Sequence, residues 1–409
     1  MTRAVRKLNK SDVFCVLPWI HLSVGTDGKV FQCCLADSQH LAGDLKVSTL
    51  AQIWNSAAMR RLRLNMLNGK PSPSCGHCDE FKRASLPTLR DSVNAVFSRH
   101  IPAAERTRPD GSLDALRLPY LDIRFSNVCN FRCRMCGPLS SSAWFEDGVK
   151  LWGELPHEKL LTPTKDPEEL RRQLEPLLPD LEEIYFAGGE PLLMEEHYRI
   201  LNLLIDRRLT DVRLRYSTNF SVMSFQGQDV MALWDKFRTV EIMASLDGMG
   251  RQGEYLRTGM VWEQILRNRE RLSKASPRAH FRVAATLNIM NSLHLPDFHA
   301  HMLDTAFIEP GMFWFTMLRF PDEYHVQALP PGLKSRVAEK YERHAEEILR
   351  RHGPRAGQEA DCFRSAPAFM AAEDKTRHLP LFKERTAKLD ALRGEKFSDV
   401  FPDLAELTR

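Results

Sequence analysis

The sequence predicts an α/β fold built on a parallel sheet. Six short segments show the apolar alternation of strands: residues 120–127, 182–189, 212–219, 239–247, 281–290 and 311–318. Between them, apolar residues recur at three- and four-residue spacing over 195–208, 227–237, 261–275 and 295–306, which is typical of helices. Strands that alternate with helices favour repeated βα units with parallel strands.

The flanking segments follow other patterns and suggest four parts. Residues 1–100 are expected to form a small α+β module, with short strands within 21–32 and one helix over 48–67. Residues 101–118 are expected to be a linker, and 119–320 the βα region. That region carries an insertion at 138–180, whose helix should start after "TPTKDP" and cover 166–178. Residues 321–409 are expected to be helical and to pack over the βα region.

Composition excludes several classes of protein. A net charge of +4 over 409 residues is too small a bias for a dedicated nucleic-acid binder. The first residues lack the apolar stretch of a secretory signal, and no apolar run is long enough for a membrane span. We therefore expect no membrane and no nucleic-acid partner, and a cytoplasmic location. The chain has nine cysteines, eight of them in two clusters, and clustered cysteines in such a chain indicate metal ligation rather than disulfides.

Three cysteines follow the first predicted strand. Cys129, Cys133 and Cys136 lie within "NVCNFRCRMCGP", where ligand chemistry gathers in βα folds. A structural zinc site uses four protein ligands, and no histidine stands beside these three. Iron–sulfur clusters are held by cysteine thiolates. Three thiolates would leave one iron open to a further ligand.

This C-x3-C-x2-C loop resembles that of the radical S-adenosylmethionine (SAM) superfamily. The resemblance implies a partial (β/α)6 TIM-like barrel, a 4Fe-4S cluster on Cys129, Cys133 and Cys136, and SAM bound at the open iron. In that family an electron from the cluster splits SAM into methionine and a 5′-deoxyadenosyl radical, which abstracts hydrogen from a substrate. The protein orients these species and excludes side reactions.

Polar residues at the ends of the later strands extend the resemblance. "FAGGEPLL" contains Gly188, Gly189 and Glu190, similar to the family's motif for the SAM amino group. Further SAM contacts are expected from side chains at the ends of the next three strands: Ser217, Asn219, Ser245, Arg257 and Asn288. In related enzymes a similar serine and arginine bind the SAM carboxylate, a role that suits the arginine fork.

The N-terminal cysteines form a second set. Cys15, Cys33, Cys75 and Cys78 resemble the twitch module, a shortened SPASM domain, which implies a second, auxiliary 4Fe-4S cluster. Cys34 is the alternative to Cys33. Without this resemblance a four-cysteine zinc site would be the first interpretation.

The function expected from this resemblance is hydrogen abstraction from a small molecule or a peptide, with the auxiliary cluster assisting oxidation. The electron donor would be a reductase, a flavodoxin or a ferredoxin. One alternative is a radical epimerase with Cys362 as hydrogen donor, although a buried, small apolar Cys362 is the simpler interpretation. Others are peptide modification or cross-linking and, least favoured, a non-catalytic zinc scaffold. No motif identifies the substrate.

Overall fold

The computed structural model describes residues 8, 11–83 and 88–409. The chain divides into two compact units, residues 1–127 with 160–215, and residues 128–159 with 216–409. The boundary between the units falls inside strand β7 (Arg213–Thr218). The predicted domain boundaries, which follow motifs rather than contacts, stay predictions.

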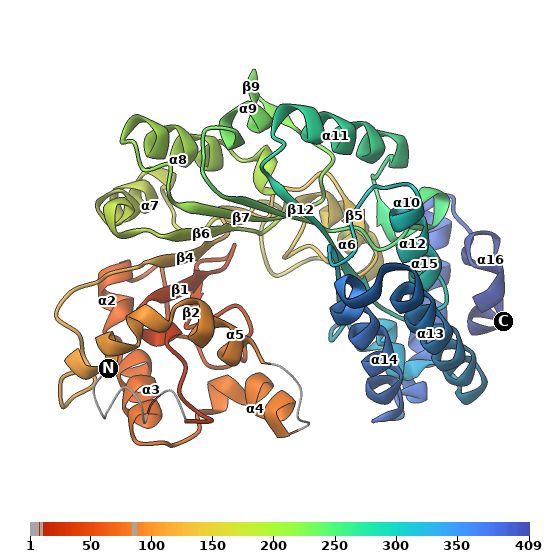
Figure 1. Ribbon diagram of the computed structural model, residues 1–409, viewed down its shortest axis with the longest axis horizontal. Coiled ribbons are helices and arrows are strands. Elements are labelled where there is room, and N and C mark those ends of the chain that lie inside the picture. The colour runs from red at the N-terminus through yellow and green to blue at the C-terminus, as the bar shows by residue number, and fades with distance from the viewer. Residues whose placement is uncertain (1–7, 9–10, 84–87) are drawn as a thin grey trace. The chain divides into compact units, whose positions relative to one another are not determined.

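The first unit is built around parallel strands. Its strands are β1 (His21–Val24), β2 (Lys29–Phe31), β3 (Gly43–Asp44), β4 (Tyr120–Ile123), β6 (Glu183–Phe186) and the start of β7. Its helices are α2 (Leu50–Trp54), α3 (Ala57–Leu67), α4 (Gly76–Arg83), α5 (Leu89–Val96), α7 (Pro167–Leu174) and α8 (Glu195–Asp206). Figure 1 shows α7 and α8 on one side of β6, and α2 to α5 gathered on the side of β1 and β2.

The second unit continues the alternation of strands and helices. Its strands are β5 (Arg132–Cys133), β8 (Ser224–Phe225), β9 (Gln228–Asp229), β10 (Val240–Ala244), β11 (Arg257–Thr258), β12 (His280–Leu287) and β13 (Phe313–Met317). Its helices are α6 (Phe145–Trp152), α9 (Val230–Trp234), α10 (Gly250–Leu256), α11 (Trp262–Ala275), α12 (Leu295–Asp304), α13 (Pro331–His352), α14 (Gly357–Ala371), α15 (Leu379–Arg393) and α16 (Phe397–Val400).

All six predicted strands of the βα region form, as β4, β6, β7, β10, β12 and β13. β4 pairs in parallel with β6, and β12 pairs in parallel with both β10 and β13. The predicted α/β class with parallel strands is thus confirmed. Residues of β12 alternate between buried and less buried, as a strand with one face in the core requires. The C-terminal region is helical, as predicted.

The N-terminal module is less separate than the sequence suggested. β1 pairs in parallel with β4 over four residues, from His21 opposite Tyr120 to Val24 opposite Ile123. β2 then pairs antiparallel with β1, and β3 with β2. The module therefore extends the sheet of the first unit and covers the open edge of β4, which would otherwise present unpaired backbone groups.

The prediction of a single helix over 48–67 is wrong, because the segment forms two helices, α2 and α3. α2 ends at Trp54, and the side chain of Ser56 caps α3 by accepting from Met59 N. Asn55 lies between them, and its side chain bonds to both backbone groups of Leu113. Local periodicity could not reveal this partner, since it comes from the predicted linker.

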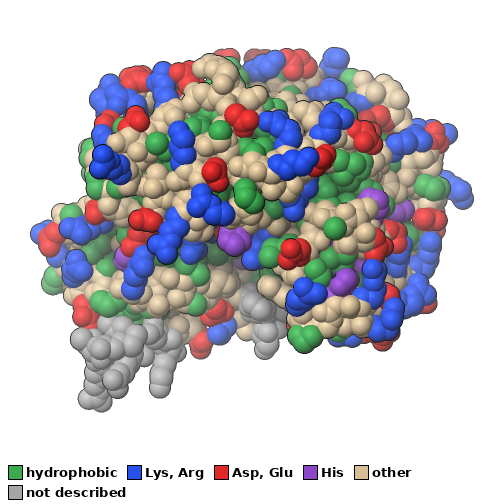
Figure 2. All heavy atoms as spheres, turned by 45° about the horizontal axis from the view of Figure 1, so that its top comes forward, with side chains coloured by type: hydrophobic (Ala, Val, Ile, Leu, Met, Phe, Trp, Pro, Cys, Tyr) green, Lys and Arg blue, Asp and Glu red, His purple; other side chains and the backbone are tan. Residues whose placement is uncertain are grey.

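The described part of the chain contains no helix with both the length and the apolar content that crossing a membrane would take. On the face drawn in Figure 2, basic and acidic side chains are interspersed.

Candidate functional site

The three-cysteine loop, residues 129–136, lies in the second unit. Its middle forms β5, which pairs antiparallel with β11, so that Cys133 stands opposite Arg257. A backbone hydrogen bond from Cys136 N to Cys133 O, 3.0 Å, turns the chain so that these two thiols can hydrogen bond to each other. Phe131 N donates to the Cys129 sulfur at 3.5 Å. The loop thus turns thiols toward one another on a hydrogen-bonded backbone.

Arg257 provides positive charge beside these thiols. Its Nη1 donates to the Cys133 sulfur at 3.8 Å, and its Nε lies 2.7 Å from Asp247 Oδ2 in a buried ion pair. The hydrogen bond with Cys136 and the charge of Arg257 lower the pKa of Cys133, against the effect of burial. A lowered pKa favours the thiolate, which is the form that binds metal.

The loop after β7 also reaches the cysteines. Asn219 Nδ2 donates to Asn130 Oδ1 at 2.8 Å and lies 4.0 Å from the Cys129 sulfur. Ser221 Oγ donates to Asn219 Oδ1 at 2.7 Å and accepts from Asn130 at 3.0 Å. These bonds close a small polar ring of three side chains next to Cys129. Asn219, one of the predicted SAM contacts, is therefore beside the cysteine loop.

The other predicted SAM contacts of the second unit hold strand-end loops in place. Ser245 N donates to Thr218 O at 2.8 Å, which joins the loop after β10 to the end of β7, next to Ser217. Asn288 is fully buried, and its side chain bonds to Thr286 O and Met290 N of its own turn. Contacts of Ser217, Ser245 and Asn288 with SAM stay predictions.

The Gly-Gly-Glu segment, residues 188–190, belongs to the first unit. Gly188 has a φ of +120°, and a Cβ there would lie 3.0 Å from Ser126 O, so the position requires glycine. Gly189 N donates to the same oxygen at 3.2 Å. The buried Glu190 accepts from Leu192 N at 3.1 Å, which fixes the direction of its carboxylate. The three residues thus form a tight turn packed on the end of β4.

The N-terminal cysteines converge within the first unit. Cys15, Cys33, Cys75 and Cys78 line one cavity, together with apolar residues and the polar side chains of Gln32, Ser74, His77 and Arg90. Burial raises the pKa of Cys15 to about 12, and the neighbouring Cys75 and Cys78 raise it further. The pKa of Cys33 is also raised, by burial and then by Cys34 and Cys15. Four thiols around one cavity are the donor set that an iron–sulfur cluster requires.

Cys34 and Cys362 are placed differently. Cys34 does not line the cysteine cavity, and the charges nearest its thiol are Asp122, Arg124 and Arg215. This arrangement supports Cys33 as the ligand of the auxiliary set. Cys362 lies on α14, which packs against α13 and β13, whereas the three-cysteine loop is bonded to β11 and the segment around α6.

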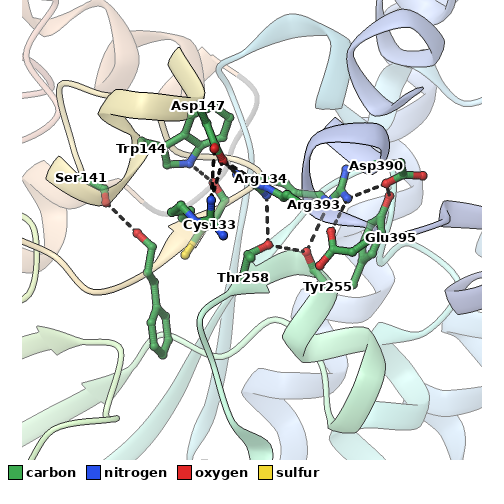
Figure 3. A network of polar contacts seen from close by, with 12 residues as sticks. Cys133, Arg134, Ser141, Trp144, Asp147, Tyr255, Thr258, Asp390, Arg393 and Glu395 are labelled. Atoms are coloured by element: carbon green, nitrogen blue, oxygen red, sulfur yellow. Dashed lines mark hydrogen bonds and ion pairs between the residues drawn. The ribbon is translucent and has the colours of Figure 1, made fainter. Parts of the chain in front are cut away.

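Sequence reasoning missed a network of charged side chains around the loop. Figure 3 shows it, and its ionic members are Arg132, Arg134, Asp147, Asp390, Arg393 and Glu395. Two of these arginines flank Cys133 directly, and the carboxylate partners of Arg134 lie 256 and 261 residues further along the chain. No local signal pairs them.

The residues present fit iron–sulfur clusters by their donor chemistry, because both sets consist of cysteine thiols. In each set the thiols lie close enough for one cysteine to raise the pKa of another. Within residues 8, 11–83 and 88–409, no three His, Cys, Asp or Glu side chains have the spacing of ligands to a single metal ion.

Comparison with protein families agrees with both cysteine sets. Residues 123–302 match the radical SAM superfamily, and residues 15–79 match an iron–sulfur cluster-binding domain, SPASM. No curated protein matches the chain.

Two of the similar solved structures are of anSMEcpe, an anaerobic sulfatase-maturating enzyme. Native anSMEcpe with bound AdoMet and Kp18Cys peptide is 16% identical over 55% of this chain and 59% of that chain, with a TM-score of 0.38. The form with Cp18Cys peptide is 15% identical over 56% and 58%, with a TM-score of 0.36. The alignments thus span less than two thirds of those proteins, and we transfer none of their properties.

The radical SAM domain implies a 4Fe-4S cluster and SAM as cofactors, and the SPASM domain implies further iron–sulfur binding. Residues 123–302 therefore form a radical SAM domain, and an iron–sulfur cluster-binding SPASM domain precedes it at residues 15–79.

Proposed function

We propose that this protein is an enzyme that cleaves SAM reductively and abstracts hydrogen from a small molecule or a peptide. The auxiliary cluster would then take up an electron from the substrate. The observation that carries the proposal is the contrast between the two cysteine sets. Three cysteines lie in one loop of the radical SAM domain, where Arg257 donates to Cys133, and four thiols surround one cavity within the SPASM domain.

In this proposal Cys129, Cys133 and Cys136 hold the cluster that supplies the electron for cleavage of SAM to the 5′-deoxyadenosyl radical. The same three thiols leave one coordination position for SAM. Cys15, Cys33, Cys75 and Cys78 complete a set that needs no further ligand.

Other side chains would hold SAM itself. We propose that Glu190 accepts hydrogen bonds from the SAM ammonium, and its bond from Leu192 N supports this by fixing the carboxylate. Arg257 would attract the SAM carboxylate while its ion pair with Asp247 keeps the guanidinium in place. Ser217, Asn219, Ser245 and Asn288 would complete the polar surroundings, with Asn219 beside Cys129.

We further propose a flavodoxin, ferredoxin or reductase as electron donor. We expect the protein to act in the cytoplasm, where its nine cysteines stay reduced.

Anaerobic reconstitution tests the proposal. The wild type should bind about eight irons per chain, as two four-iron clusters require. Cys133→Ala should lose about half of that iron and release no 5′-deoxyadenosine from SAM with a strong reductant. Cys75→Ala should lose a similar amount of iron yet still release 5′-deoxyadenosine. Cys34→Ala, a neighbour outside the cysteine cavity, is the matched control and should keep the iron of both sets.

Two outcomes would contradict the proposal. A colourless protein that binds zinc and leaves SAM intact would favour the zinc scaffold. A Cys75→Ala variant with full iron would remove Cys75 from the auxiliary set.

Transfer of deuterium from a labelled candidate substrate into 5′-deoxyadenosine would decide between a peptide and a small molecule as substrate.

A further inference from the structure

The end of helix α15 is bonded to the three-cysteine loop of the same unit. Arg134, the residue after Cys133, is fully buried, and its Nη2 donates to Asp390 Oδ1 and to Glu395 Oε2, both at 2.6 Å. Its guanidinium lies 3.6 Å from the ring centre of Tyr255, whose hydroxyl donates to the same Asp390 oxygen at 2.8 Å. The loop residue is thus held on two sides by groups from α10 and the C-terminal segment (Figure 3).

A second contact joins the same two segments. Arg132, the residue before Cys133, donates to both carboxylate oxygens of Asp147, at 3.1 and 3.2 Å. Arg393 donates to Asp147 Oδ2 through Nε and Nη2, at 3.1 and 3.0 Å, and to Thr258 Oγ1 at 3.0 Å. One buried carboxylate therefore links the loop to the last turn of α15.

Cys133 lies between these two contacts. Its carbonyl accepts from Trp144 Nε1 at 2.7 Å, its backbone pairs with Arg257, and its sulfur accepts from Arg257 Nη1 at 3.8 Å. Arg132 on one side and Arg134 on the other are each tied to carboxylates. The middle cysteine of the set is therefore restrained through its own groups and through both neighbours.

The turn after α15 explains how one short segment makes both contacts. Gly394 ends the helix in the left-handed conformation, with φ 66° and ψ 33°, which glycine adopts without strain. Glu395 N then donates to Asp390 O at 3.0 Å, and Phe397 N donates to Asp390 Oδ2 at 2.7 Å. These bonds bring Asp390, Arg393 and Glu395 to the same side of the chain.

We propose that residues 390–395 act as a positioning clamp that sets the place of Cys133 in the three-cysteine set. Three arginines face three carboxylates in this network, so its charges balance. Buried ion networks add little net stability compared with apolar packing, but they demand one geometry. Groups around a metal ligand orient it and tune the metal. The clamp would act on the cluster ligand whatever the substrate is.

The test uses the full-length holoprotein and the variant Arg134→Lys. Lysine keeps the charge but has a single ammonium in place of the planar fork. We expect wild-type iron content, a changed electron paramagnetic resonance signal and midpoint potential for the SAM-binding cluster, and SAM affinity reduced about tenfold. The control is Arg343→Lys on α13, where an exposed arginine meets Glu339. It should leave all these quantities unchanged.

A second variant separates positioning from stability. The triple substitution Arg134→Met, Asp390→Asn and Glu395→Gln removes the charges together, so no charge of the trio is left buried alone. If the network positions Cys133, this triple variant should be more thermally stable than variants that lose a single charge. It should still show an altered resonance signal of the SAM-binding cluster and weakened SAM binding. If this variant does not fold, Glu395→Gln takes its place, because this side chain is 24% exposed and Arg134 keeps its pair with Asp390. It should fold, and should still show an altered resonance signal and weakened SAM binding.

Wild-type resonance signal, potential and SAM affinity in Arg134→Lys would overturn the proposal and leave the network a stabilising contact only. Recovery of all three in the folded triple variant would overturn it as well. These measurements read the cluster and SAM binding and need no substrate. A wild-type protein that assembles no cluster would instead refute the proposed function.

Discussion

Replacing Arg257 by glutamine should strongly destabilise the second unit. The Arg257 side chain is 11% exposed and that of Asp247 is fully buried, with Nε and Oδ2 2.7 Å apart. Burial lowers the pKa of Arg257, but Asp247 and Cys133 outweigh this effect and raise it, so the guanidinium stays charged. Without the guanidinium, Asp247 would keep one backbone donor, Thr286 N at 2.7 Å.

The size of the effect follows from the burial of the pair. Removing one partner of a buried ion pair costs about 3–5 kcal/mol, because the other charge stays in a medium that solvates it poorly. For a unit of the size of residues 128–159 with 216–409, each kcal/mol lowers the melting temperature by about 2–4 °C. Arg257→Gln should therefore lower the melting temperature of this unit by roughly 6–20 °C.

Thermal unfolding of the reduced, iron-free protein, followed by circular dichroism, measures this effect without a contribution from metal. The double variant Arg257→Gln, Asp247→Asn should recover most of the loss, since no charge of the pair remains. Arg271→Gln is the matched control, because its ion pair with Asp229 at 3.0 Å is exposed and is worth at most about 1 kcal/mol. Equal shifts for Arg257→Gln and Arg271→Gln would refute the reasoning.

Three further predictions concern the first unit. Arg63→Met should cost at least about 2 kcal/mol in the same unfolding assay, because the buried guanidinium donates to Pro18 O and Trp54 O, both at 2.8 Å; the exposed Arg61→Met should cost far less. Gly188→Ala should cost about 1–3 kcal/mol and weaken SAM binding in calorimetry, whereas Gly227→Ala, also at positive φ but facing open space, should leave SAM binding unchanged. Burial lowers the pKa of His21 to about 4 and that of His197 to about 3. Both histidines are neutral in either state above about pH 6.5, so their contribution to folding stability is complete there. As the pH falls toward these values, the unfolded chain binds more protons and that stability is lost. The melting temperature should fall across that range. A flat profile would contradict the prediction, because it would mean that these histidines take up protons equally in the folded and the unfolded chain.

Much of the fold was predictable because its signals are local. Strand alternation and helical spacing found all six strands of the βα region, and the Asp166 cap with Pro167 marked the start of α7. The predicted ends of helices were less accurate where a proline follows. The helix expected to reach residue 178 becomes a 3-10 helix from Glu175 onward, with Pro176 near its start.

The candidate sites were predictable for a related reason. Cysteine spacing and a Gly-Gly-Glu turn are short-range patterns that carry their chemistry in the residue types themselves. Family comparison bears out the two domains that these patterns indicated. The choice between Cys33 and Cys34 was open in the sequence, because adjacent residues share the same local pattern, and the cavity that Cys33 lines now favours it.

The sequence by itself therefore determined the α/β class, the two cysteine sets and their chemistry. Tertiary structure decided which charged groups surround those cysteines. Arg134 meets Asp390 and Glu395 across 256 and 261 residues, and β1 joins β4 across about a hundred. Such partners are selected by burial and by the requirement that buried charges and strand edges be paired, which depends on the folded chain as a whole. The spacing of residues along the chain therefore does not predict these partners.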